Sequence, residues 1–111
     1  MLTRTTETLL SAGSLTTNWT ENEIDVSACV GVSLQLYCVT SQTIDVGIKF
    51  AQSGTYASPV ELNGTDYARL IVDGDTDSIW IPTIGKEKLF IQTQNSGTIA
   101  DVTVRLEKVI A

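Results

Sequence analysis

The chain has 111 residues, which is enough for one domain and too few for two, so we expect a single domain over 1–111. Its 42% of hydrophobic residues is more than a disordered chain carries. The net charge is −6 and the seven Lys and Arg residues form no basic stripe, so we expect no nucleic acid and no membrane among its partners.

The N-terminal segment, residues 1–20, forms either an arm that leaves the domain or an edge strand of it. It is rich in threonine from Thr3 to Thr8, and an extended arm of this kind adds a strand to the sheet of a partner. Trp19 follows in a polar stretch, where its ring is either exposed, and free to stack on a ligand, or a lid over one end of the domain. A short strand is expected at 22–26.

The strongest strands alternate apolar and polar residues with a period of two. They cover residues 32–39, 44–50 and 102–106, and the apolar residues of the last two that we expect to be buried are Ile44, Val46, Ile48, Phe50, Val102, Val104 and Leu106. An extended segment separates Cys29 from Cys38 and places the two sulfurs on the order of 25 Å apart. We therefore expect two free, buried thiols and no disulfide.

Weaker strands are expected at 68–72, 78–83 and 88–93, the last with apolar residues on both faces. Turn signals such as Asn63-Gly64 and Asp73-Gly74 separate the strands about every ten residues, a spacing typical of sandwiches and barrels. The sequence therefore predicts an all-β fold: a two-sheet antiparallel β-sandwich, jelly-roll-like, with eight or nine short strands.

The sequence contains no histidine, which removes the usual general base, the histidine-dependent nucleophiles and nearly all zinc sites. Asp73, Asp75 and Asp77 match the first half of a calcium loop. However, Ser78 and Ile84 stand where such a loop has its glycine and its bidentate glutamate. We interpret the cluster as an acidic hairpin tip. The sequence therefore predicts no catalytic residue, no cofactor and no metal site, and we do not expect an enzyme.

Three large apolar side chains, Ile71, Trp80 and Phe90, point away from the apolar faces of their strands. If these faces adjoin, the three side chains form an apolar patch, and such patches usually mark protein interfaces. The alternative is that they lie under loops or on inward-curving ends of the sheet. The first interpretation predicts a homo-oligomer that also binds a larger protein lattice.

A family resemblance rests on the order of several segments along the chain. These are the strand at 22–27, the strand at 32–39, a polar turn at 40–43, the strand at 44–50, the motif Ser53-Gly54-Thr55-Tyr56 and the final strand at 102–106. The pattern resembles the small β-sandwich or jelly-roll virion proteins of tailed phages, which include head decoration (cement) proteins and related tail accessory proteins.

The resemblance implies a non-enzymatic structural protein on the capsid surface of a virion, assembled in the host cytoplasm. The implied partner is the major capsid protein or another virion protein. Because capsid surfaces offer threefold positions, the resemblance also favours a trimer. Two other functions stay open: a carbohydrate- or receptor-binding module, which needs exposed aromatic rings and a groove, and a tail or neck accessory protein.

Overall fold

The computed structural model describes residues 2–60, 66–76, 78–95 and 97–110, and their regular structure is all β-strand. The seven strands are β1 (Thr3–Leu15), β2 (Thr20–Asp25), β3 (Cys29–Lys49), β4 (Ala68–Asp75), β5 (Ile79–Pro82), β6 (Lys88–Asn95) and β7 (Ile99–Ile110). Within the described ranges there is no helix long and apolar enough to cross a membrane.

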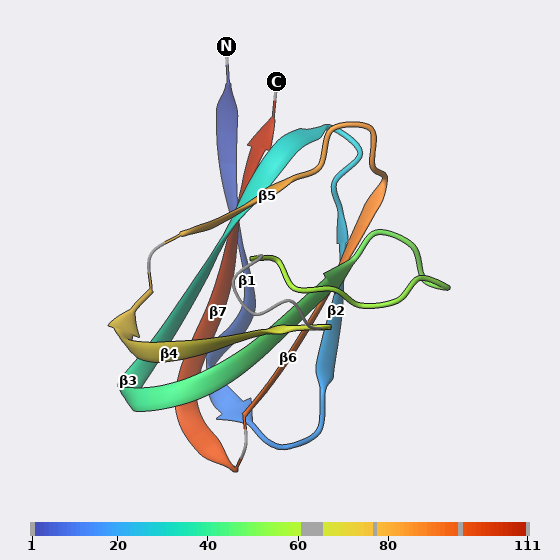
Figure 1. Ribbon diagram of the computed structural model, residues 1–111. Helices are drawn as coiled ribbons and strands as arrows, with labels where there is room; N and C mark the ends of the chain where they lie inside the picture. The colour runs from blue at the N-terminus through green and yellow to red at the C-terminus, as the bar shows by residue number, and fades with distance from the viewer. Residues whose placement is uncertain (1, 61–65, 77, 96, 111) are drawn as a thin grey trace.

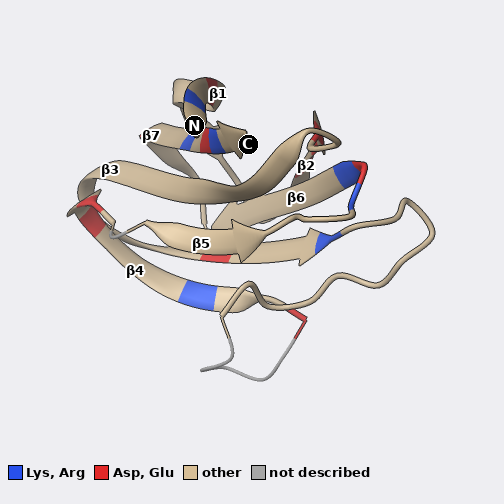
Figure 2. Cartoon of the chain, turned by 90° about the horizontal axis from the view of Figure 1, so that it is seen from above, with Lys and Arg blue, Asp and Glu red and all other residues tan. Residues whose placement is uncertain are grey.

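All strand pairs are antiparallel, and hydrogen bonds connect all seven strands in one continuous sheet. The main path through the sheet is β1-β7-β3-β6-β2, and β4 and β5 both pair with the other edge of β3. Figures 1 and 2 show that this sheet curls strongly into a half-barrel. The all-β, antiparallel part of the predicted fold is therefore confirmed.

The long strand β3 explains why two separate sheets do not form. Its first half pairs with β7 and β5, and its second half pairs with β6 and β4. The register against β4 shifts between Cys38 and Gln42, and at this corner Gly74 of β4 has a φ of 72°. The predicted turn at 40–43 is thus a bend within one strand. Two expected strands merge into one, which leaves seven instead of eight or nine.

The connection from β2 to β3 shows how far the sheet curls. β2 ends at Asp25 opposite Lys88, whereas β3 begins at Cys29 opposite Ile110. In a straight ladder Lys88 and Ile110 would lie roughly 70 Å apart, yet the chain between β2 and β3 spans roughly 13 Å at most. The two ends of the run from β6 to β7 are therefore close together, and the two halves of the sheet face each other across the core.

The core fills the space inside the curl. Its fully buried side chains include Leu15, Ile24, Val32, Leu34, Leu36, Ile81, Leu89 and Ile91. Five of the seven residues predicted to be buried are buried, whereas Ile48 and Phe50 are only partly buried and pack against the core. Cys29 and Cys38 are free and buried, as predicted, and burial raises the pKa of both thiols.

β1 lies at an edge of the sheet and pairs with β7 from Thr3 opposite Ile110 to Leu15 opposite Ile99. The pairing is regular from Thr3 to Thr8, and register shifts interrupt it beyond this point. The N- and C-terminal ends of the chain consequently lie side by side (Figure 1).

Candidate functional site

Two of the hollows on the described surface have lining residues that differ in chemistry. The first, which we call the apolar groove, has a volume of about 680 Å³ and lies between β4 and β5. It is lined by Pro59, Val60, Leu70, Ile71, Asp73, Asp75, Thr76, Ser78, Ile79 and Trp80. The second, the aromatic pocket, has a volume of about 450 Å³. It is lined by Trp19, Gly54, Thr55, Tyr56, Asp66, Tyr67 and Gln92.

The apolar groove forms at the open edge of the half-barrel. β4 and β5 pair with different halves of β3, so the bend of β3 separates them. Both faces of β4 contribute to the groove, because Leu70 packs against the core whereas Ile71 is 77% exposed. The groove is therefore lined both by side chains of the outer face of β4 and by side chains at the edge of the hydrophobic core.

Trp80 is the aromatic side chain of the groove, and it is 48% exposed. Its ring lies on Gly31 of the neighbouring strand, where a Cβ atom would overlap ring atoms Cζ2 and Cη2. A glycine is required at this position because the ring occupies the space of a side chain. Gly31 thus leaves room for the Trp80 ring against the sheet, and part of the ring remains in solvent.

The structure brings two of the three predicted interface residues together. Ile71 and Trp80 both line the apolar groove, whereas Phe90 does not. Phe90 is 4% exposed and lies under the side chain of Lys49, whose Nζ is 5.4 Å from the centroid of the Phe90 ring. The expectation of a single patch that includes all three residues is therefore wrong, because Lys49 covers the outer position on β6.

The polar side chains in the middle of the groove are already hydrogen-bonded within the protein. Thr76 Oγ1 accepts from the backbone N–H of Leu36 at 3.0 Å and donates to the Leu36 carbonyl at 3.2 Å. Ser78 Oγ accepts from Gln35 Nε2 at 3.2 Å. What the groove offers a partner is therefore mainly its apolar surface.

The acidic cluster lies at the rim of this groove. Asp73 and Asp75 belong to β4, with Gly74 between them inside the strand and not at a hairpin tip. Asp77 lies outside the described residues. Among the residues that the structure describes, no group of three or more Cys, Asp or Glu is placed to hold a metal ion.

The aromatic pocket lies on the outer face of the other half of the sheet. Gly47 of β3 lies under it, where a Cβ atom would be 3.1 Å from both the Asp66 carbonyl oxygen and Gln92 Nε2. The missing side chain lets both groups approach the sheet. The rings of Trp19 and Tyr67 meet at an interplanar angle of 61°, with centroids 5.6 Å apart, and form a corner of the pocket.

Tyr56 forms another wall of the aromatic pocket and is held from two sides. Its hydroxyl donates a hydrogen bond to the Glu21 carboxylate, and Lys49 Nζ lies 4.6 Å from its ring centroid. Burial, together with the Glu21 carboxylate, raises the pKa of Tyr56 well above its usual range. The phenol is protonated at neutral pH, and the raised pKa keeps its hydrogen bond to Glu21 into more alkaline solution.

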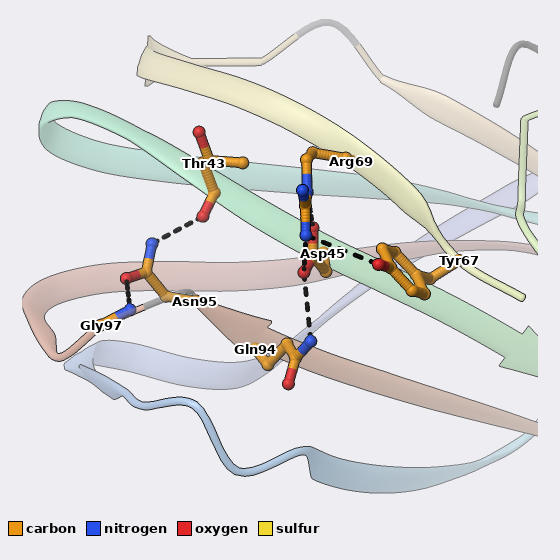
Figure 3. Close-up of polar contacts among 7 residues, drawn as sticks. All are labelled: Thr43, Asp45, Tyr67, Arg69, Gln94, Asn95 and Gly97. Carbon is orange, nitrogen blue, oxygen red and sulfur yellow. Dashed lines mark hydrogen bonds and ion pairs between the residues drawn. The ribbon is translucent and has the colours of Figure 1, made fainter. Parts of the chain in front are cut away.

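An ion pair between the buried Asp45 carboxylate and the largely exposed Arg69 guanidinium supports the same face from the side of β4. Asp45 is 2% exposed, and its carboxylate accepts from Arg69 Nε at 2.9 Å, from Arg69 Nη2 at 3.2 Å and from Gln94 Nε2 at 3.1 Å. Arg69 Nη2 also lies 3.5 Å from the Tyr67 hydroxyl. Figure 3 shows how this network joins Tyr67 of the pocket to the strands below it.

Asp45, Arg69 and Gln94 were not among the site residues predicted from the sequence. The alternation of β3 placed Asp45 on a solvent-facing side, and its partners are 24 and 49 residues away along the chain. The only local signal is a carboxylate within a strongly apolar strand. Trp19, which the sequence did single out as a candidate stacking ring, is 37% exposed and lines the aromatic pocket.

Comparisons with known proteins give one informative result. No protein-family model matches the sequence. No curated protein matches it either. The structure is similar to that of the SPBc2 prophage-derived protein YomS, with a TM-score of 0.64 and 16% identity over 98% of this chain and 95% of that one.

A second similarity is much weaker. RmlC from Streptococcus suis, solved in complex with dTDP-D-xylose, gives a TM-score of 0.36 and 8% identity. The match covers 99% of this chain and 44% of RmlC, and no argument rests on it. The likeness to YomS, by contrast, extends over nearly the whole length of both proteins, and this chain shares the YomS fold.

Proposed function

We propose that this chain is a non-enzymatic structural protein of a phage or prophage particle, and that it decorates the outer surface of the head. The observation that carries the proposal is the shared fold with a prophage-derived protein over 98% of this chain. A likeness over the whole length supports a common type of protein better than a shared motif does. On this proposal the chain is located in the virion after assembly in the host cytoplasm.

The apolar groove supplies the contact with the neighbouring virion protein. Ile71 and Trp80 expose apolar area there, and burial of such area contributes roughly 25 cal/mol for each Å². Because the Trp80 ring already lies against the backbone at Gly31, we expect little loss of side-chain entropy when a partner covers it. Rigid aromatic anchors of this kind commonly dominate the energy of an interface.

The chemistry of the chain also favours a binding role over a catalytic one. The sequence has no histidine, and the polar groups at the centre of the groove are hydrogen-bonded within the protein. The blue segments in Figure 2 are scattered over the described residues and outline no stripe that would follow a phosphate backbone. We propose the major capsid protein as the partner and a trimer as the oligomeric state, at the threefold positions of the lattice.

Two measurements test this function. Light scattering of the isolated protein is expected to give the mass of a trimer. Co-sedimentation with purified heads of the encoding phage is expected to show saturable binding. The variants Ile71→Ser and Trp80→Ser should each weaken head binding by about tenfold or more, as loss of an interface anchor does.

Ile84→Ser is the matched control, because Ile84 is 74% exposed but does not line the groove. Its binding should equal that of the wild type. Immunogold labelling of intact particles separates head from tail. Gold label on the tail or neck would show that the protein is a tail or neck accessory protein and not a head decoration protein. If intact particles carry no label, the proposal is wrong.

A further inference from the structure

We propose that the aromatic pocket is a binding site for a neutral saccharide, and that a single pyranose unit lies against Trp19 and Tyr67 with its hydroxyl groups directed at Gln92 and Asp66. The volume of about 450 Å³ lies within the range of small-ligand sites. The site shares no residue with the apolar groove, so it is independent of the proposed assembly role.

The two rings at the corner of the pocket suit the apolar face of a sugar. A pyranose ring has one face of C–H groups, which packs on an aromatic ring, and a periphery of hydroxyl groups. Trp19 lies in a polar stretch of the sequence, and its ring is 37% exposed. The ring meets that of Tyr67 at an angle of 61°, so the two rings enclose a concave corner. Two aromatic walls at this angle are able to hold a flat apolar ligand face.

Tyr67 is held in place before any ligand arrives. The Arg69 guanidinium lies 5.7 Å from the Tyr67 ring centroid and contacts its hydroxyl, and Asp45 fixes Arg69 in turn through two hydrogen bonds. A binding site whose side chains are fixed in advance loses less entropy when it binds. The ion pair between Asp45 and Arg69 therefore has a role as support for the pocket.

The polar groups of the pocket keep their hydrogen-bonding capacity. The side-chain amide of Gln92, the carboxylate of Asp66 and the hydroxyl of Thr55 make no hydrogen bond with another described residue. Gln94, two residues along the same face of β6, instead donates to Asp45. An amide donates and accepts, and a carboxylate accepts two hydrogen bonds, so Gln92 and Asp66 match adjacent sugar hydroxyls.

The charge of the site argues for a neutral sugar over an acidic one. Asp66 is the charged side chain among the described lining residues. The charges behind the walls pair with each other, Lys49 with Glu21 behind Tyr56 and Arg69 with Asp45 behind Tyr67, and the chain as a whole carries a net charge of −6. Carboxylates repel uronic and sialic acids but strengthen hydrogen bonds from neutral hydroxyl groups. Hexoses and their N-acetyl derivatives are therefore the class that fits.

The test uses the intact protein, labelled with ¹⁵N, and a panel of methyl glycosides of neutral hexoses and N-acetylhexosamines. At least one glycoside is expected to shift the Trp19 indole N–H and the Gln92 side-chain amide in a saturable manner at millimolar concentrations. The Trp80 indole, which belongs to the apolar groove, should not move. The variant Gln92→Leu should weaken binding by about tenfold, as the loss of a ligand hydrogen bond does.

Gln35→Leu is the control, since Gln35 is an outer-face glutamine on the other half of the sheet that does not line the pocket. The change removes the hydrogen bond from Gln35 to Ser78, which belongs to the apolar groove and not to the pocket. The affinity of this variant should equal that of the wild type. In Trp19→Ala the glycoside should no longer shift the Gln92 side-chain amide, while the rest of the spectrum should remain that of a folded protein. If no member of the panel shifts Trp19 or Gln92, or if Gln92→Leu binds like the wild type, the site is not a saccharide site. A failure here leaves binding to phage heads unaffected, because that binding uses Trp80 and Ile71.

Discussion

The apolar groove and the aromatic pocket are both hollows on the outside of one curled sheet, but they differ in what they leave available to a ligand. The groove leaves apolar side chains exposed, whereas the pocket leaves polar side chains without a hydrogen-bond partner. In the groove, Thr76 and Ser78 already have hydrogen-bond partners, whereas Ile71 and Trp80 remain exposed. In the pocket, Gln92 and Asp66 have no partner among the described residues. The groove therefore suits an apolar protein surface, and the pocket suits a ligand rich in hydroxyl groups.

The difference follows from how each hollow is supported. A backbone glycine, Gly31, supports the groove by leaving room for the Trp80 ring. A buried charge supports the pocket, because Asp45 positions Arg69 and, through it, Tyr67. Mutations in the two supports should therefore damage the two sites separately, and the following predictions use this separation.

The largest effect is expected for Arg69→Ala. The change leaves the buried Asp45 carboxylate with Gln94 as its side-chain donor among the described residues, and the loss of two charge-assisted hydrogen bonds to a buried carboxylate costs about 2–3 kcal/mol of unfolding free energy. Urea denaturation measures this loss. Tyr67 also loses its support, so saccharide binding should fall while head binding through the groove is retained.

Arg105→Ala is the control for this experiment. Arg105 lies on β7 and makes no ion pair with another described residue, so its replacement should change stability by less than about 0.5 kcal/mol. Equal destabilisation by both changes would show that the Asp45 network has no special role.

The second prediction concerns the support of the groove. In Gly31→Val the new side chain occupies the position of the Trp80 ring, so the ring must leave the sheet surface. We expect a loss of about 1–2 kcal/mol of unfolding free energy, typical of an overpacked site, together with a red-shifted Trp80 fluorescence. Head binding should weaken, whereas the Trp19 and Gln92 signals of the pocket should not change.

The third prediction compares two glutamines on one face of β6. Gln94→Leu removes a donor from a buried carboxylate and should cost about 1 kcal/mol, whereas Gln92→Leu removes no internal hydrogen bond and should stay within about 0.5 kcal/mol of the wild type. Thermal melts of both variants check this. Equal costs would mean that Gln92 also has a structural partner and is not free for a ligand.

The smallest effect is a loss of stability in alkaline solution. The folded-state pKa of Tyr56 is raised above its ordinary value of 10.0, and those of Cys29 and Cys38 are raised above 9.0. A raised pKa means that the unfolded chain releases these protons first, so the stabilisation is complete below about pH 9 and is lost as the pH rises further. Melts between pH 8 and 11 should show the decrease.

Tyr56→Phe isolates the contribution of the pocket to this alkaline loss. The variant should retain the loss from the two thiols but lose less stability than the wild type above pH 10. The described lining of the groove holds no Tyr, Cys or Lys, so the Trp80 environment should follow only global unfolding. An unchanged profile in Tyr56→Phe would contradict the raised pKa of Tyr56.

The local pattern of the sequence was sufficient for the strands and for part of the core. Alternation along 44–50 and 102–106 depends only on neighbouring residues, and it predicted the burial of Ile44, Val46 and Leu106 correctly. The same pattern predicted that Phe50 is buried, but Phe50 follows the last residue of β3, where it is half-buried and Lys86 Nζ lies 5.1 Å from its ring centroid. Alternation predicts which face of a strand a residue lies on, but not how much of that face the rest of the protein buries.

What the sequence determined by itself was therefore the class of fold, the two free thiols and the absence of histidine chemistry, since these depend on composition and on short-range periodicity. Only the tertiary structure decided that β3 continues through its bend, that Asp45 is buried with Arg69, and that Lys49 covers Phe90. It also brought Trp19 to Tyr67 and Ile71 to Trp80. The reason is physical: these contacts join residues far apart in the chain, and they exist only because the sheet curls until its two halves face each other.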